Sequence, residues 1–144
     1  MKTFVDTSAF YALADTTDRH HSVARKVYEE LIGKEELITT DYVFLECWFL
    51  ISHHLGRNAA LKFWDFLLSG AVELVMAERK DLENAREIVA EYRDQDFSLV
   101  DAVNFAVMER LGIKKAFTFD AHFHIYRFGR EKQERFEVIP LSPP

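Results

Sequence analysis

Residues 2–15 read KTFVDTSAFYALAD, and this stretch holds the first strand and the first helix that we expect. Its apolar start, residues 2–5, suits a buried strand, and residues 8–14 suit a helix. Asp6 stands at the junction between the two. The simplest interpretation is that Asp6, or a hydroxyl residue just after it, caps the helix, because short oxygen-bearing side chains satisfy the free N–H groups there.

The same alternation of a short strand with a helix continues along the chain. We expect strands at residues 2–5, 36–40, 72–76, 115–119 and 136–141. We expect helices at residues 8–14, 22–32, 41–55, 59–68, 80–92 and 98–111. Such alternation predicts an α/β fold with a mainly parallel sheet covered by helices on both faces.

The bulk properties favour a cytoplasmic protein with one domain. A length of 144 residues suits a single domain, residues 1–144. A single cysteine, Cys47, cannot form an internal disulfide, which favours a reducing compartment. No segment approaches the ~20 apolar residues of a membrane span, and Asp6 and Asp15 interrupt any signal-peptide core. We therefore expect no membrane association.

The charge distribution gives a weak indication of a polyanionic partner. The net charge of −6 argues against nonspecific affinity for nucleic acid. Residues 110–135 nevertheless carry seven basic and three acidic side chains, so this segment could meet phosphate. A solvated surface is the simpler interpretation of these charges.

Two aspartates follow predicted strands directly. Asp6 follows the first strand, and Asp120 follows the strand that contains Thr118. Each aspartate could cap the turn after its strand. In open parallel sheets, however, ligands bind beyond the carboxyl ends of the strands. Asp6 and Asp120 could therefore point into one crevice.

Two further carboxylates stand in apolar surroundings. Glu46 has aromatic or aliphatic neighbours at helical spacing, and an unpaired buried carboxylate is costly, so either an ion pair or a function must explain it. Asp101 fits a capping box with Ser98, but the first turn of its helix is otherwise apolar. Asn104 shares a helix face with Asp101, and Asp96 could reach the same place.

If these carboxylates converge, they require a cation, because like charges raise one another's pKa. Oxygen ligands favour a hard ion, Mg²⁺ or Mn²⁺, and such an ion can activate water for phosphodiester cleavage. The six histidines do not have the spacing of a zinc site, so we interpret them as surface or loop residues. His122 lies near Asp120 and could touch a substrate.

Four segments together resemble the acidic motifs of PIN domains, in order and spacing over nearly the whole chain. They are FVDTSAFYAL at 4–13, Glu46 in its apolar helix, FSLVDAVNFAV at 97–107 and TFDAHF at 118–123. The size is similar to that of small prokaryotic PIN proteins, including VapC-type toxins.

This resemblance implies a three-layer α/β/α sandwich and a metal-dependent endoribonuclease. By motif, Asp6, Glu46, Asp101 and Asp120 would be the catalytic acids, with Asp6 and Asp101 as direct ligands of Mg²⁺ or Mn²⁺. Ser8, Asp96 and Thr118 would support them. The implied reaction is in-line attack by water that leaves a 5′-phosphate and a 3′-hydroxyl. A toxin would also have an antitoxin partner, a segment of which lies across the active-site groove.

Two other functions remain as alternatives. A phosphatase with Asp6 as nucleophile usually has a second aspartate two residues later, where this chain has Ser8. A non-catalytic PIN-like module that binds RNA or protein need not keep four acids. Aromatic residues crowd two adjacent helices and indicate core packing, a homodimer interface away from the acids, or stacking platforms for bases: Trp48, Phe49, Phe63, Trp64 and Phe66.

Overall fold

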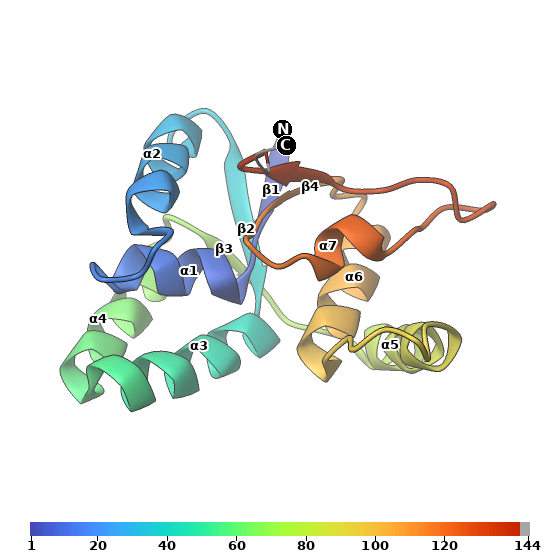
Figure 1. Cartoon of the computed structure of the whole chain (residues 1–144), viewed down its shortest axis with the longest axis horizontal. Helices are drawn as coiled ribbons and strands as arrows, with labels where there is room; N and C mark the ends of the chain where they lie inside the picture. The colour runs from blue at the N-terminus through green and yellow to red at the C-terminus, as the bar shows by residue number, and fades with distance from the viewer. Residues whose placement is uncertain (142–144) are drawn as a thin grey trace.

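A five-stranded parallel sheet, in the order β3-β2-β1-β4-β5, runs through the computed structural model, which describes residues 1–141 (Figure 1). The strands are β1 (Lys2–Val5), β2 (Glu36–Thr40), β3 (Glu73–Val75), β4 (Lys115–Phe117) and β5 (Glu137–Ile139). The helices are α1 (Thr7–Ala14), α2 (His21–Leu31), α3 (Asp41–Leu55), α4 (Arg57–Leu68), α5 (Arg79–Glu91), α6 (Leu99–Leu111) and α7 (His122–Ile125).

The central position of β1 explains its apolar sequence. Phe4 lies opposite Ile38 of β2 and Ala116 of β4, and all three side chains are buried. Parallel strands covered on both faces have such continuous apolar runs. Helices α1 and α2 lie on one side of the sheet, and α6 and α7 lie on the other (Figure 1). The predicted parallel sheet between helical layers is confirmed.

Three strands are shorter than we expected, one helix was not predicted, and most other helix ends shift by one or two residues; β5 covers residues 137–139 of the expected 136–141. We expected a strand over residues 115–119, but β4 ends at Phe117, and the backbone N–H of Phe119 donates to Ser8 instead. β3 is likewise shorter than residues 72–76. The short helix α7 was not predicted, because four residues are too few for a periodic pattern. Within residues 1–141, none of the helices has the length and apolar character that crossing a membrane requires.

An aromatic cluster joins the two elements that carry part of the site described below. The Phe105 ring of α6 stacks on Tyr126 at 4.7 Å between ring centroids and meets Phe123 of α7 edge-on at 5.0 Å. Phe136, just before β5, packs against the same rings. Such aromatic pairs add about 1 kcal/mol each beyond their buried area. The cluster therefore fixes α7 relative to α6.

Candidate metal centre

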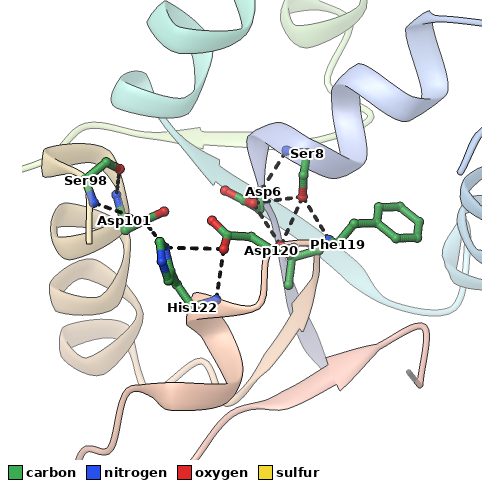
Figure 2. A network of polar contacts seen from close by, with 8 residues as sticks. Asp6, Ser8, Ser98, Asp101, Phe119, Asp120 and His122 are labelled. Carbon is green, nitrogen blue, oxygen red and sulfur yellow. Dashed lines mark hydrogen bonds and ion pairs between the residues drawn. The ribbon is translucent and has the colours of Figure 1, made fainter. Parts of the chain in front are cut away.

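Three aspartates from distant parts of the chain gather at the carboxyl edge of the sheet (Figure 2). Asp6 follows β1 and Asp120 follows β4 by three residues, and these two strands are hydrogen-bonded neighbours. Asp101 lies in the first turn of α6. The sheet thus brings together three of the four acids that the sequence motifs indicate.

Hydroxyl groups hold Asp6 in a fixed orientation. Thr118 Oγ1 donates to Asp6 Oδ2 at 2.9 Å, and Ser8 Oγ donates to the same oxygen at 3.0 Å. The Ser8 backbone N–H also points to Asp6 Oδ2, at 3.5 Å, so Asp6 caps α1. The Phe119 N–H donates to Ser8 Oγ at 2.8 Å and ties the loop after β4 into this network. Asp6 is therefore a helix cap and a member of the acidic cluster at once.

Asp101 likewise both caps a helix and lies in the acidic cluster. The Ser98 side chain accepts from the Asp101 N–H at 3.0 Å, and Asp101 Oδ2 accepts from the Ser98 N–H at 3.1 Å, which completes the expected capping box. The side chain is nevertheless only 6% exposed, because the start of α6 enters the core. The cap fixes one carboxylate oxygen of Asp101 and leaves the other directed into the site.

His122, which we interpreted from the sequence as a surface or loop residue near Asp120, belongs to the same polar network. Its Nδ1 lies 2.8 Å from Asp101 Oδ2 and 3.4 Å from Asp120 Oδ1 (Figure 2). Its backbone N–H donates to Asp120 Oδ1 at 2.9 Å. One ligand atom each from Asp101, Asp120 and His122 lie within 4.8 Å of one another. The D-x-H spacing directly after a strand is the signal that could have identified it.

Asp6 and Asp101 resist ionisation in the absence of a cation. Burial raises the pKa of Asp6 to about 7, against the hydrogen bond from Thr118, and the charges of Asp120 and Asp101 raise it further. Burial raises the pKa of Asp101 as well, and the charge of Asp120 adds to that effect. A site that opposes negative charge in this way is electrostatically matched to a bound cation.

The oxygen atoms at the site fit a hard divalent cation. Among the hydrogen bonds and ion pairs of residues 1–141, each aspartate uses only one of its two carboxylate oxygens. The remaining oxygens are Oδ1 of Asp6, Oδ1 of Asp101 and Oδ2 of Asp120. Carboxylate oxygens are the ligands that Mg²⁺ and Mn²⁺ prefer. A divalent cation could therefore be held by Asp6, Asp101 and Asp120.

Glu46 and Asp96 stand outside this hydrogen-bonded network. Glu46 is half-buried on α3, and Asp96 is exposed before α6. Within the described part of the chain, neither side chain makes a hydrogen bond or an ion pair. Burial raises the pKa of the Cys47 thiol, and the charges of Asp6 and of its sequence neighbour Glu46 add to this effect, so α3 packs Cys47, rather than Glu46, towards Asp6. The catalytic role of Glu46 and the supporting role of Asp96 stay predictions.

Many of the basic side chains between residues 110 and 135 form ion pairs or hydrogen bonds with other groups of the chain. Arg110 makes two hydrogen bonds of 2.9 Å to the fully buried Asp81. Lys114 pairs with Glu134 at 3.3 Å, and Arg127 donates to carbonyls at the end of α7. Further ion pairs within the chain are Lys115 with Glu35 and Lys132 with Glu91. This segment is therefore a poor candidate for a continuous phosphate-binding surface.

Comparisons with known proteins agree with the motif resemblance. The family model described as PIN domain matches residues 3–129. The 23S rRNA-specific endonuclease VapC20 of Mycobacterium tuberculosis is 30% identical over 131 residues, which cover 91% of this chain and 98% of that protein. Ribonuclease VapC26 of the same organism is 30% identical over 138 residues, 94% of this chain and 98% of that protein.

The fold comparison gives the same result. The crystal structure of Mycobacterium tuberculosis VapC20, described as a sarcin-ricin loop cleaving toxin, matches with a TM-score of 0.81 and 30% identity, over 85% of this chain and 93% of that chain. VapBC2 from Rickettsia felis, bound to a DNA fragment from its promoter, shares the fold with a TM-score of 0.71 at 11% identity, over 99% of this chain and 100% of that chain. The motifs, the parallel sheet and both relatives agree: the chain belongs to the PIN domain family.

Proposed function

We propose that this protein is a VapC-type, metal-dependent endoribonuclease that hydrolyses phosphodiester bonds of RNA. The gathering of Asp6, Asp101 and Asp120 at one edge of the sheet (Figure 2) supports this most directly, and the charges of Asp120 and Asp101 act on Asp6. Mg²⁺ or Mn²⁺ is the cofactor that suits three carboxylates. Asp6 and Asp101 are the direct ligands, because one oxygen of each is already fixed by a helix cap.

The side chains around the acids have distinct tasks in this reaction. Thr118 and Ser8 hold Asp6, and His122 holds Asp101 and Asp120 at a fixed separation. When bound, a divalent cation activates water and stabilises charge that develops on the phosphate. Glu46 supplies a further carboxylate at the edge of the site, on α3.

The relatives indicate which RNA to test first. VapC20 is named as specific for 23S rRNA and as cleaving the sarcin-ricin loop, so ribosomal RNA is the first substrate class that we propose for this chain. VapC20 is also described as a toxin. We therefore propose a toxin role in the cytoplasm, with an antitoxin as the protein partner.

The cleavage assay uses purified protein with an end-labelled sarcin-ricin-loop hairpin, and with a transfer RNA for comparison. We expect cleavage with Mg²⁺ or Mn²⁺ that is lost with EDTA and in Asp101→Asn. Asp65→Asn, an exposed aspartate on α4, is the matched control and should cleave normally. Cleavage that survives in Asp101→Asn would contradict the site. If neither RNA is cut and calorimetry detects no metal binding, the alternative of a non-catalytic binding module is favoured.

The exposed apolar surface of α3 and α4 supports a homodimer. Phe49 is 62% exposed and Trp64 is 40% exposed, whereas Phe63 of the same aromatic set is buried in the core. Large exposed apolar patches commonly mark interfaces. We expect Phe49→Asp to halve the mass measured by light scattering, and Val89→Asp on α5 to leave it unchanged. A wild-type protein that is monomeric at micromolar concentration would exclude the dimer.

A further inference from the structure

A second feature of the sheet's carboxyl edge is an aromatic cavity beside the aspartates. It has a volume of about 440 Å³ and lies over the ends of β4 and β5. It is lined by His20 and Val23 at the start of α2, by His124 of α7 and by Pro140. This volume is within the usual range for ligand pockets, roughly 300–1,000 Å³.

The residues between β4 and α7 connect this cavity to the metal centre. Thr118 and Phe119 line the cavity. Thr118 also donates to Asp6 at 2.9 Å, and the Phe119 N–H donates to Ser8 at 2.8 Å. Side chains alternate in direction along an extended segment, and Figure 2 shows the Phe119 ring pointing away from Asp6 and Asp101. One short loop thus separates the acids from the cavity.

The wall of the cavity contains a stacked pair of rings. The His20 imidazole lies on the Phe119 ring with 4.3 Å between centroids and 12° between planes. The Arg19 side chain donates to His20 Nε2 at 3.1 Å. This hydrogen bond orients the imidazole and brings the Arg19 guanidinium beside it. Proteins hold unpaired RNA bases by stacking them on such aromatic rings and on arginine, and each base gains affinity from the stack.

We propose that this cavity binds a nucleobase of the RNA substrate, at a position flanking the scissile phosphate. The phosphate lies at the aspartates, and the neighbouring base turns over the loop at residues 118–121 and adds a third ring to the His20–Phe119 stack. His20 and Phe119 are then specificity-determining residues. This base site rests on the proposed ribonuclease activity. The experiment must therefore separate a loss of base recognition from an absence of cleavage.

A cavity of equal volume elsewhere lacks this connection. It lies between α1, α2 and α4 and is also lined by aromatic rings, among them Phe63 and Phe66. None of the residues that line it belongs to the polar network of the aspartates within residues 1–141. Phe66→Ala therefore serves as the matched control, because it removes a ring of similar exposure from a cavity that is remote from the acids.

The experiment combines protein variants with abasic RNA. The probe is a short RNA that the wild-type protein cuts, and versions of it with one abasic ribose at each position near the cleavage site. We expect one abasic position to lower kcat/KM about tenfold, and His20→Ala and Phe119→Ala to lower it similarly on intact RNA. With either variant, removal of that base should cause no further decrease in kcat/KM. With Phe66→Ala, removal of the base should still lower kcat/KM about tenfold, as it does with the wild-type protein.

Each result has a defined meaning. An abasic effect that is unchanged in Phe119→Ala would overturn the base site, and so would RNA that tolerates every abasic position. Both results leave the ribonuclease activity standing, since cleavage itself is observed. If the wild-type protein cuts no RNA, the proposed function fails, and the base site fails with it. A structural defect alone would lower cleavage of intact and abasic RNA by the same factor.

Discussion

Replacing Asp6 with asparagine should stabilise the metal-free protein. In the folded chain, burial raises the pKa of Asp6 to about 7, whereas an aspartate exposed to water has a pKa of 3.8. Above pH 7 the folded state must therefore carry a charge that its surroundings disfavour. A difference of about three pKa units corresponds to roughly 4 kcal/mol. Asp6→Asn removes this cost and keeps an oxygen that can accept from Thr118 and Ser8.

The sign and the pH window follow from the linkage between proton binding and folding. Below pH 3.8 Asp6 is protonated in both states, and it costs no stability. As the pH rises towards 7, the unfolded chain loses this proton and the folded chain keeps it, so wild-type stability falls. The advantage of Asp6→Asn should thus be about 1.6 kcal/mol at pH 5 and about 4 kcal/mol at pH 8.

Thermal unfolding in EDTA measures this difference. For a chain of this size, 1 kcal/mol shifts Tm by roughly 2–4 °C, so Asp6→Asn should unfold at least ~8 °C above wild type at pH 8, with a smaller gap at pH 5. Mn²⁺ at 100 times its Kd should narrow the gap at pH 8, since it adds about 2.7 kcal/mol to the protein that binds it, which is less than the advantage of about 4 kcal/mol that Asp6→Asn has there. Equal gaps at both pH values, or a wild-type protein that Mn²⁺ does not stabilise, would refute the reasoning.

Three other substitutions test individual contacts. Thr118→Val removes the 2.9 Å hydrogen bond to Asp6 and should weaken Mn²⁺ binding about tenfold by calorimetry, with the fold retained by circular dichroism. His122→Ala should weaken Mg²⁺ and Mn²⁺ by similar factors, roughly tenfold, if the imidazole only orients the carboxylates; a loss confined to Mn²⁺ would instead make it a direct ligand. Arg110→Ala leaves the buried Asp81 carboxylate without its bidentate partner and should lower the free energy of unfolding by about 3 kcal/mol in urea titrations, whereas an unchanged midpoint would contradict that value.

The fold could be predicted because its signals are local and repeated. Each strand is a short, mainly apolar run that a helix or turn follows. A strand such as Lys2–Val5 can therefore be recognised from its own residues, without knowledge of its position in the sheet. What the sequence does not contain is the strand order, because β1 pairs with β2 and β4 across long intervening segments. The short helix α7 was missed for a related reason: its position depends on packing against Phe105 and not on its own pattern.

The site was predictable where a residue's position follows from the sheet itself. Asp6 and Asp120 lie near the carboxyl ends of two parallel strands, and that edge is where ligands bind. Glu46 was harder to place, because its apolar neighbours suggested a buried helix face. In the structure Phe49 and Leu50 are 62% and 37% exposed, so the apolar surface of α3 extends beyond the core. The apolar neighbours of Glu46 in the sequence therefore did not show whether its carboxylate lies in the core or at the surface.

The pairing of β1 with β4 also has a consequence during synthesis of the chain. Thr118 and Asp6, which share a hydrogen bond, are 112 residues apart in the sequence. The ribosome must therefore add all of the residues between them before β4 can join β1 and bring Asp120 beside Asp6. Until then a growing chain carries the first aspartate without its partners. A ribonuclease with this topology therefore has no complete acidic cluster until the segment that follows β4 has been synthesised.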